Sequence, residues 1–449
     1  MSIMISRTSH RLAAAFWVAL CVSPLAGVGP EPTIVPDLLA SEPLRDNLYM
    51  TYSNPKSWSV ELNSYLVTPH PHMELGPPDR NNHSWATMIN DLKDAGIVYP
   101  IVTASGSSWS VPGREREVSI LIDQDQYSLR LDRHLRQGSR GPEMVFRPQF
   151  SGWTQFVRVQ IHADMVSVDT HFDQRRAERL GWPERWPEEA ERFRTPLIDS
   201  LGSQNELRAA VLASNPDSVA IERLLETLDE ERGGNALSPI HEAKFLAARL
   251  IEVFEVNQPP MIPTRNARFL RMLENGEESP APFELRTRGN FDGFNVMNPD
   301  DAARNLGGSL HDRTTLLTSL YRAAGLPART VIGLEYKLKG DPIYRSWTEF
   351  ALYDPDLDLL LWVPVNLEDL TRTRIASGAY RSKWKNFGSG DLHTIVPIAF
   401  SFHPPDTNKT TRVPSLVGIR PASGTTAVPR FTEQFMNHTM EPMGPPKSP

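Results

Sequence analysis

The stretch that decides the fold of this chain is Gly307-Gly-Ser-Leu-His-Asp312, continued downstream by Arg322-Ala-Ala-Gly-Leu-Pro-Ala-Arg329. The residues between the two quoted segments predict a helix, because their apolar members recur at spacings of three and four. Gly325 and Pro327 then predict the end of this helix. The expected buried face consists of Leu316, Leu317, Leu320, Tyr321 and Ala324.

Three strand-like runs follow this helix, each rich in β-branched or aromatic residues: 329–336, 346–353 and 359–365. Three aspartates between the last two runs, at 354, 356 and 358, imitate the opening of a calcium-binding loop. Leu359 stands where such a loop needs glycine, so we interpret the segment as a polar hairpin turn. The order of helix and strands predicts an α+β domain with a helix packed on an antiparallel sheet.

The rest of the chain divides by its residue pattern. Residues 48–195 contain short, partly alternating apolar runs between glycine and proline clusters, which predicts a β-rich N-terminal domain. Residues 196–403 form the α+β domain, with helices expected at 219–228 and 239–256. Residues 404–449 are rich in proline and threonine and predict a flexible tail.

The first residues resemble an export signal. Arg7 and Arg11 precede the apolar stretch 12–22, which is shorter than the roughly 20 residues that a membrane-spanning helix needs. We therefore expect a signal peptide at 1–29, a linker at 30–47, and a periplasmic, cell-surface or extracellular location; a retained N-terminal anchor is the alternative. Cys21 is the only cysteine, so a processed chain has no disulfide, thiolate ligand or cysteine nucleophile.

Composition narrows the range of partners. The net charge is -7 and acidic and basic residues are interspersed, without the basic stripe that nucleic acids select. We expect no nucleic-acid partner and no membrane contact beyond the signal segment. His70, His72 and His83 lack further clustered ligands, so we predict neither a metal site nor a cofactor.

The quoted stretch resembles transglutaminase-like domains, which share the papain-like cysteine-protease fold. Arg322–Arg329 is similar to the end of the active-site helix and the start of the first strand. The resemblance extends from Pro196 to His403 and is strongest between Pro299 and Leu367. Three further segments match landmarks of the family: Asp301–Gly308, Trp347–Phe350 and Trp362–Val365.

The resemblance implies that catalysis has been lost. In that family a cysteine at the start of the helix is activated by a strand histidine, and an aspartate on the next strand orients the histidine. The corresponding positions here are Leu310, Arg345 and Asn366. Leucine has no nucleophilic atom, and a guanidinium stays protonated and cannot act as a base. The sequence therefore predicts an inactive member.

The sequence is compatible with two kinds of function. The first is peptide or protein binding, or a scaffold role, with Asp312, Arg345 and Trp347 as candidate contacts. The second is a hydrolase or acyltransferase with a non-cysteine nucleophile such as Ser309, for which His311, His393 and His403 are the candidate bases. The spacing of Ser309 and Asp312 also fits a helix capping box, which would explain both residues without catalysis.

Overall fold

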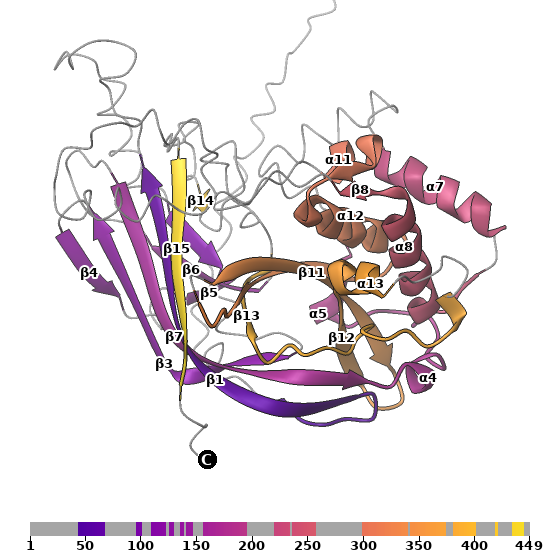
Figure 1. Ribbon diagram of the computed structural model, residues 1–449, viewed down its shortest axis with the longest axis horizontal. Coiled ribbons are helices and arrows are strands. Elements are labelled where there is room, and N and C mark those ends of the chain that lie inside the picture. The colour runs from indigo at the N-terminus through magenta and orange to yellow at the C-terminus, as the bar shows by residue number, and fades with distance from the viewer. Residues whose placement is uncertain are drawn as a thin grey trace, which may run out of the picture.

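The computed structural model describes residues 44–67, 96–100, 109–122, 125–129, 135–138, 141–146, 156–194, 220–233, 236–256, 299–339, 342–373, 380–400, 418–420 and 433–443. Within these ranges the strands form one five-stranded sheet, two four-stranded sheets and a short two-stranded pair. Most helices gather beside one of the four-stranded sheets (Figure 1). This combination of helices and antiparallel sheets confirms the predicted α+β class.

The predicted helix is α12 (Leu310–Ala323). Three strands follow it: β10 (Ala328–Glu335), β11 (Ile343–Asp354) and β12 (Leu359–Val365). With β13 (Ile395–Ala399) they form an antiparallel sheet in the order β12-β11-β10-β13, which we call the central sheet. In the turn between β11 and β12, Asp354 Oδ1 accepts the backbone N–H groups of Asp356 and Leu357. The predicted hairpin turn is confirmed.

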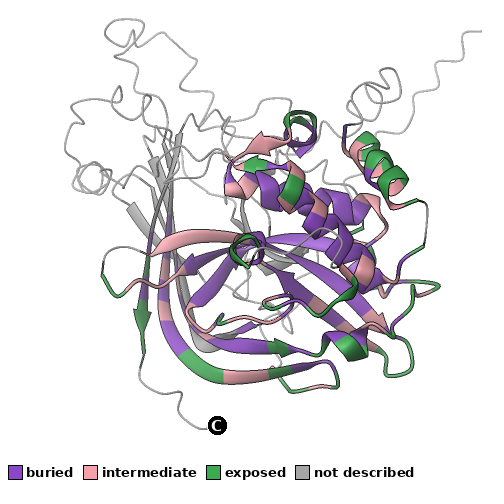
Figure 2. Ribbon diagram, turned by 45° about the vertical axis from the view of Figure 1, so that its right-hand side comes forward, coloured by how far each residue is buried: buried purple, intermediate pink, exposed green. Residues whose placement is uncertain are grey.

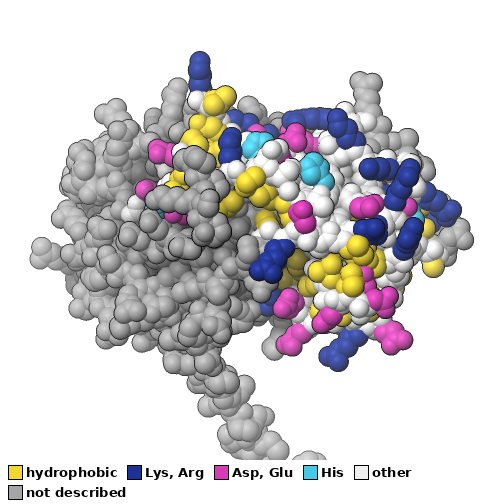
Figure 3. Space-filling view, turned by 90° about the horizontal axis from the view of Figure 1, so that it is seen from below, with side chains coloured by type: hydrophobic (Ala, Val, Ile, Leu, Met, Phe, Trp, Pro, Cys, Tyr) yellow, Lys and Arg dark blue, Asp and Glu magenta, His cyan; other side chains and the backbone are white. Residues whose placement is uncertain are grey.

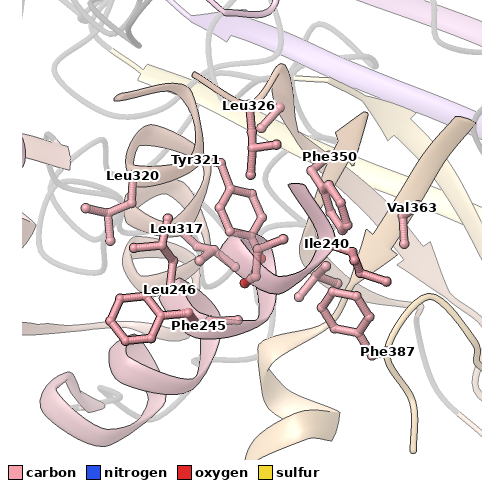
Figure 4. Close-up of a cluster of buried hydrophobic side chains, with 14 of the residues drawn as sticks. Ile240, Phe245, Leu246, Leu317, Leu320, Tyr321, Leu326, Phe350, Val363 and Phe387 are labelled. Carbon is pink, nitrogen blue, oxygen red and sulfur yellow. Dashed lines mark hydrogen bonds between the residues drawn. The ribbon is translucent and has the colours of Figure 1, made fainter. Parts of the chain in front are cut away.

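Helix α12 is buried against the central sheet and helix α8 (Pro239–Val253). Leu316, Leu317, Leu320 and Tyr321 are each 0% exposed, as their spacing predicts. Burial of each leucine contributes roughly 1.5–3 kcal/mol. The Tyr321 hydroxyl donates a hydrogen bond of 2.8 Å to the carbonyl oxygen of Ala243 in α8. Figure 4 shows Leu317, Leu320 and Tyr321 in one core with three phenylalanines, Phe245, Phe350 and Phe387.

Two polar side chains in the middle and last turns of α12 form hydrogen bonds inside the fold. The Thr318 hydroxyl lies 2.9 Å from that of Thr330 in β10 and 3.1 Å from that of Thr348 in β11. Arg322 Nε donates to the carbonyl oxygen of Ala328 at 2.6 Å, and burial lowers the pKa of Arg322 to about 9. Because these bonds reach two strands, they fix the rotation of α12 about its axis and therefore the direction of its first turn.

Smaller elements surround this core. Helices α7 (Ala220–Arg232) and α11 (Pro299–Asn305) contact α12, and β8 (Glu255–Val256) pairs in parallel with β9 (Gly307–Gly308). Helix α13 (Leu367–Arg372) follows β12 directly. Buried residues concentrate where the helices meet the central sheet (Figure 2).

The N-terminal region is built on two long antiparallel strands, β1 (Met50–Val67) and β7 (Phe156–Phe172). They curve beneath the central sheet in Figure 1. The five-stranded sheet has the order β15-β1-β7-β3-β4 and includes β3 (Ser110–Ile122), β4 (Asp125–Leu129) and β15 (Glu433–Pro442). The other sheet consists of β14 (Gly418–Arg420), β2 (Gly96–Pro100), β6 (Gly141–Phe146) and β5 (Leu135–Gly138).

The expectation of a flexible tail is wrong for residues 433–442. This segment forms β15, which pairs with β1 from Trp58↔Pro442 to Val67↔Glu433. Met440 is buried in the pairing, and the ring of His438 accepts the backbone N–H of Asn63 at 3.0 Å. Backbone pairing with an existing strand holds the segment in place, and such pairing does not require a sustained apolar period in the sequence.

The hydrophobic core continues across the predicted boundary at residue 195. Helices α4 (Gln174–Ala177) and α5 (Glu188–Glu191) follow β7 and pack into the same core as α12. The Gln174 side chain donates to the carbonyl oxygen of Trp384 and accepts its backbone N–H. Of the two tryptophans near this boundary, Trp186 is buried in the core, whereas Trp182 is 42% exposed.

Several sequence expectations fall outside the described residues: the signal segment 1–29, the histidines at 70, 72 and 83, and His403. Within the described ranges, no helix is both long and apolar enough to span a lipid bilayer.

Candidate functional site

The first turn of α12 is closed by a capping box. Ser309 Oγ accepts the backbone N–H of Asp312 at 3.1 Å, and Asp312 Oδ2 accepts the backbone N–H of Ser309 at 2.7 Å. Asp312 Oδ2 also accepts the Ser309 hydroxyl at 2.9 Å. Both side chains are buried. The predicted capping box is confirmed, and these bonds engage the Asp312 carboxylate within the protein.

Leu310 is the first helical residue and is partly buried. Its carbonyl oxygen accepts the Thr314 hydroxyl at 3.0 Å, within the same turn. The side chain contributes only carbon atoms at the helix end, where unpaired amides and the helix dipole favour negative charge.

The next residue, His311, reaches strand β11. Its Nδ1 lies 2.8 Å from the hydroxyl oxygen of Ser346. Burial lowers the pKa of His311 to about 4, with the charge of Arg345 as a second cause. The imidazole is therefore neutral near pH 7. The sequence favours Ser309 as the candidate nucleophile, whereas in the structure His311 lies within hydrogen-bond distance of Ser346.

Arg345 on β11 is held between two carboxylates. Its Nε donates to Glu335 Oε2 on β10 at 2.5 Å, and its Nη1 pairs with Glu368 Oε2 on α13. Burial alone would lower the pKa of Arg345, but the two carboxylates outweigh burial and raise it above its usual value. Glu335 is also paired with Lys337 at 2.6 Å. The guanidinium is thus fixed in its charged form.

Asn366 caps helix α13. Its Oδ1 accepts the backbone N–H of Glu368 at 3.0 Å, and its Nδ2 donates to Asp369 Oδ2 at 3.0 Å. The side chain therefore has a structural partner at both ends. It begins the turn that carries Glu368 toward Arg345.

These contacts connect two of the three positions inferred from the resemblance. Arg345 pairs with Glu368, at the start of the helix that Asn366 caps. The third position, Leu310, precedes His311, which bonds to Ser346, the neighbour of Arg345 on β11. None of the three side chains supplies a nucleophile or a neutral base.

Trp347 packs in a hydrophobic cluster with Trp109 from the N-terminal region of the chain. It is 2% exposed, and its ring lies 4.2 Å from that of Trp109, centroid to centroid. Its partner strand leaves room for the ring only because residue 333 is glycine, where an added Cβ would meet the ring at 2.6 Å. Of the three contacts proposed from the sequence, Asp312 and Trp347 are enclosed and Arg345 keeps a side-chain exposure of 24%.

The sequence analysis did not identify three residues that contact His311 or Arg345, namely Ser346, Glu335 and Glu368. It also did not identify Arg313, on which the charge of Glu368 acts. Arg313 lies in the first turn of α12 and is 2% exposed. Burial lowers its pKa to about 10, a shift that the charge of Glu368 opposes, so it remains charged at neutral pH. The sequence signal that could have identified it is a basic residue in a first helical turn, where the dipole disfavours positive charge.

The described residues contain no group of three histidine, cysteine or carboxylate side chains arranged to hold a metal ion. Basic and acidic side chains of the described residues are interspersed on the face shown in Figure 3. The exclusion of nucleic-acid partners stays a prediction.

Comparison with known proteins gives a family match over part of the chain. Residues 285–367 match the sequence profile of the family described as Transglutaminase-like superfamily. No curated protein sequence matches the chain significantly.

Three solved structures resemble this one at low identity. A candidate cysteine protease from Cytophaga hutchinsonii is 12% identical, with a TM-score of 0.44 over 89% of this chain and 95% of that chain. The periplasmic domain of TgpA from Pseudomonas aeruginosa, bound to ethylmercury, is 15% identical, with a TM-score of 0.24 over 70% and 89%. A candidate protease from Parabacteroides distasonis is 10% identical, with a TM-score of 0.20 over 70% and 67%.

The lowered pKa of His311 predicts a specific dependence of stability on pH. Its pKa is about 4 in the folded chain and 6.5 ordinarily, so between these values the unfolded state binds more protons. The free energy of unfolding should therefore fall as the pH drops through this window, by up to about 1.4 kcal/mol per pH unit from this residue. His311→Asn, which keeps a polar atom near Ser346, should flatten this slope in urea unfolding between pH 4 and 7. Identical slopes for both chains would contradict the assignment.

Proposed function

We propose that the chain uses the region that matches the transglutaminase-like superfamily, residues 285–367, to bind peptides or proteins without acyl-transfer catalysis. The observation that carries the proposal is the state of Arg345. Two carboxylates hold this guanidinium in its charged form, at the position where the resemblance implies a histidine base. A group held in this way cannot accept a proton from a nucleophile.

The position of Leu310 supports the same conclusion. In this family the nucleophile stands at the start of the helix, where the dipole favours a thiolate. Here the first helical residue is a leucine, and the only cysteine of the chain is Cys21. We also propose that the chain is exported and acts in the periplasm, at the cell surface or outside the cell, on the basis of the signal-like segment 1–29.

A peptide selection distinguishes binding from a scaffold role. Peptides enriched from a displayed library on the purified protein should bind Leu310→Trp at least about tenfold more weakly, because the larger ring would obstruct the start of α12. Leu338→Trp is the matched control, because Leu338 is 90% exposed, and it should bind as the wild type does.

If no peptide is enriched, or if enriched peptides bind Leu310→Trp as tightly as the wild type, binding at this site is contradicted and a scaffold role is favoured. Affinity for each variant is measured by isothermal titration calorimetry on the full chain.

A hydrolase remains the second candidate because His311 Nδ1 lies 2.8 Å from Ser346 Oγ, a distance suited to a nucleophile and its base. The electrostatic environment of His311 disfavours such a hydrolase reaction. A serine nucleophile needs its histidine to accept a proton during the reaction, and both burial and the charge of Arg345 disfavour the imidazolium.

We therefore expect no covalent labelling of the wild type by a fluorophosphonate probe at pH 7 to 9, as measured by intact-protein mass spectrometry. Labelling that persists in Ser309→Ala and disappears in Ser346→Ala would support the hydrolase and contradict the non-catalytic proposal.

A further inference from the structure

Arg313 is a buried cation whose guanidinium has no hydrogen-bonding partner among the residues that the structure describes. It is 2% exposed, and no described residue accepts a hydrogen bond from its guanidinium. Its Nε is enclosed and unsatisfied. A buried charge without a partner is strongly destabilising, and buried polar groups are satisfied in the great majority of cases. Such a group therefore calls for an acceptor.

Arg313 lies in the first turn of α12, the helix that Leu310 begins. Side chains on a helix generally tilt back toward its N-terminus, which favours a position of the guanidinium near this helix start. The charge of Glu368 acts on it from the first turn of α13. Arg313 thus lies between the starts of two helices, where both dipoles favour a negative group.

The carboxylates in this neighbourhood already have other partners. Asp312 accepts from Ser309 in the capping box. Glu368 pairs through Oε2 with Arg345 and through Oε1 with Arg372. Glu335 is shared between Arg345 and Lys337. The donors of Arg313 are consequently left for an acceptor that the described residues do not provide.

We propose that Arg313 and the first turn of α12 bind a carboxylate of a peptide ligand, either a free C-terminus or an acidic side chain. A carboxylate matches the planar donor fork of a guanidinium. The charge of Glu368, which acts on Arg313, disfavours a dianion such as phosphate, so a group with a single charge is preferred. This inference rests on the proposed peptide-binding function and names the chemical group that the site recognises.

The test compares three probes on the full chain: N-acetyl tetra-alanine with a free C-terminus, the same peptide as its C-terminal amide, and sodium acetate. The free acid should bind, and Arg313→Met should weaken it about ten- to a hundredfold. Acetate should compete with the free acid, and the amide should bind at least about tenfold more weakly. Arg372→Met is the control, because Arg372 pairs with the same Glu368 but its side chain is 64% exposed, and it should bind as the wild type does.

A second measurement guards against misfolding. Without ligand, Arg313→Met should unfold at the same temperature as the wild type or at a higher one, because the change removes an unpaired buried charge. A large fall in the unfolding temperature would mean that Arg313 has a structural partner, and the proposal would be overturned.

The outcomes separate this inference from the function on which it rests. If Arg313→Met binds the free acid as tightly as the wild type, or if the amide binds equally well, the carboxylate site is wrong and peptide binding stands. If acetate alone binds in an Arg313-dependent manner, the carboxylate site stands and peptide recognition fails. If none of the three probes binds, both are overturned.

Discussion

The burial of helix α12 between the central sheet and helix α8 is the constraint on which the rest of the structure depends. In a helix enclosed on this many sides, most polar groups must form hydrogen bonds within the protein, because water does not reach them. Thr318 does so through two strands, Arg322 through the carbonyl oxygen of Ala328, and Tyr321 through α8. These bonds set the rotation of the helix, so its first turn is delivered to β11 and α13 in a fixed orientation.

The chemistry of that first turn follows from its charges. Burial and the positive charge of Arg345 lower the pKa of His311, so the imidazole stays neutral and is a poor proton acceptor. The positive charges of Arg345 and Arg313, together with the dipole of α12, favour a bound anion. A site that opposes base catalysis is in this way suited to recognising a negative group.

Much of the central domain could be predicted from the sequence because its signals are local. The apolar spacing of Leu316 to Tyr321, the capping pair Ser309 and Asp312, and the turn at Asp354 each depend on residues a few positions apart. Strand β15 was missed because its stability comes from pairing with β1, far away in the chain. Local pattern carries no information about such a partner.

The candidate site was predicted only in outline for the same reason. The resemblance located Leu310, Arg345 and Asn366, but their partners depend on strand register and helix packing. His311 meets Ser346 across 35 positions, and Arg345 meets Glu368 across 23. Arg313 was missed because an arginine in a first turn is ordinarily exposed, and only the packed structure shows that it is buried.

The central claim is that Leu310 and Arg345 share one site at the start of α12, and a thiol introduced at position 310 tests it most directly. With Cys21→Ser as background, the pH dependence of alkylation by iodoacetamide gives the pKa of the thiol in Leu310→Cys. The account predicts a pKa at least about one unit below the ordinary value of about 8.5, with recovery toward that value when Arg345→Met is added. A thiol that titrates near 8.5 with or without Arg345 would contradict the shared site.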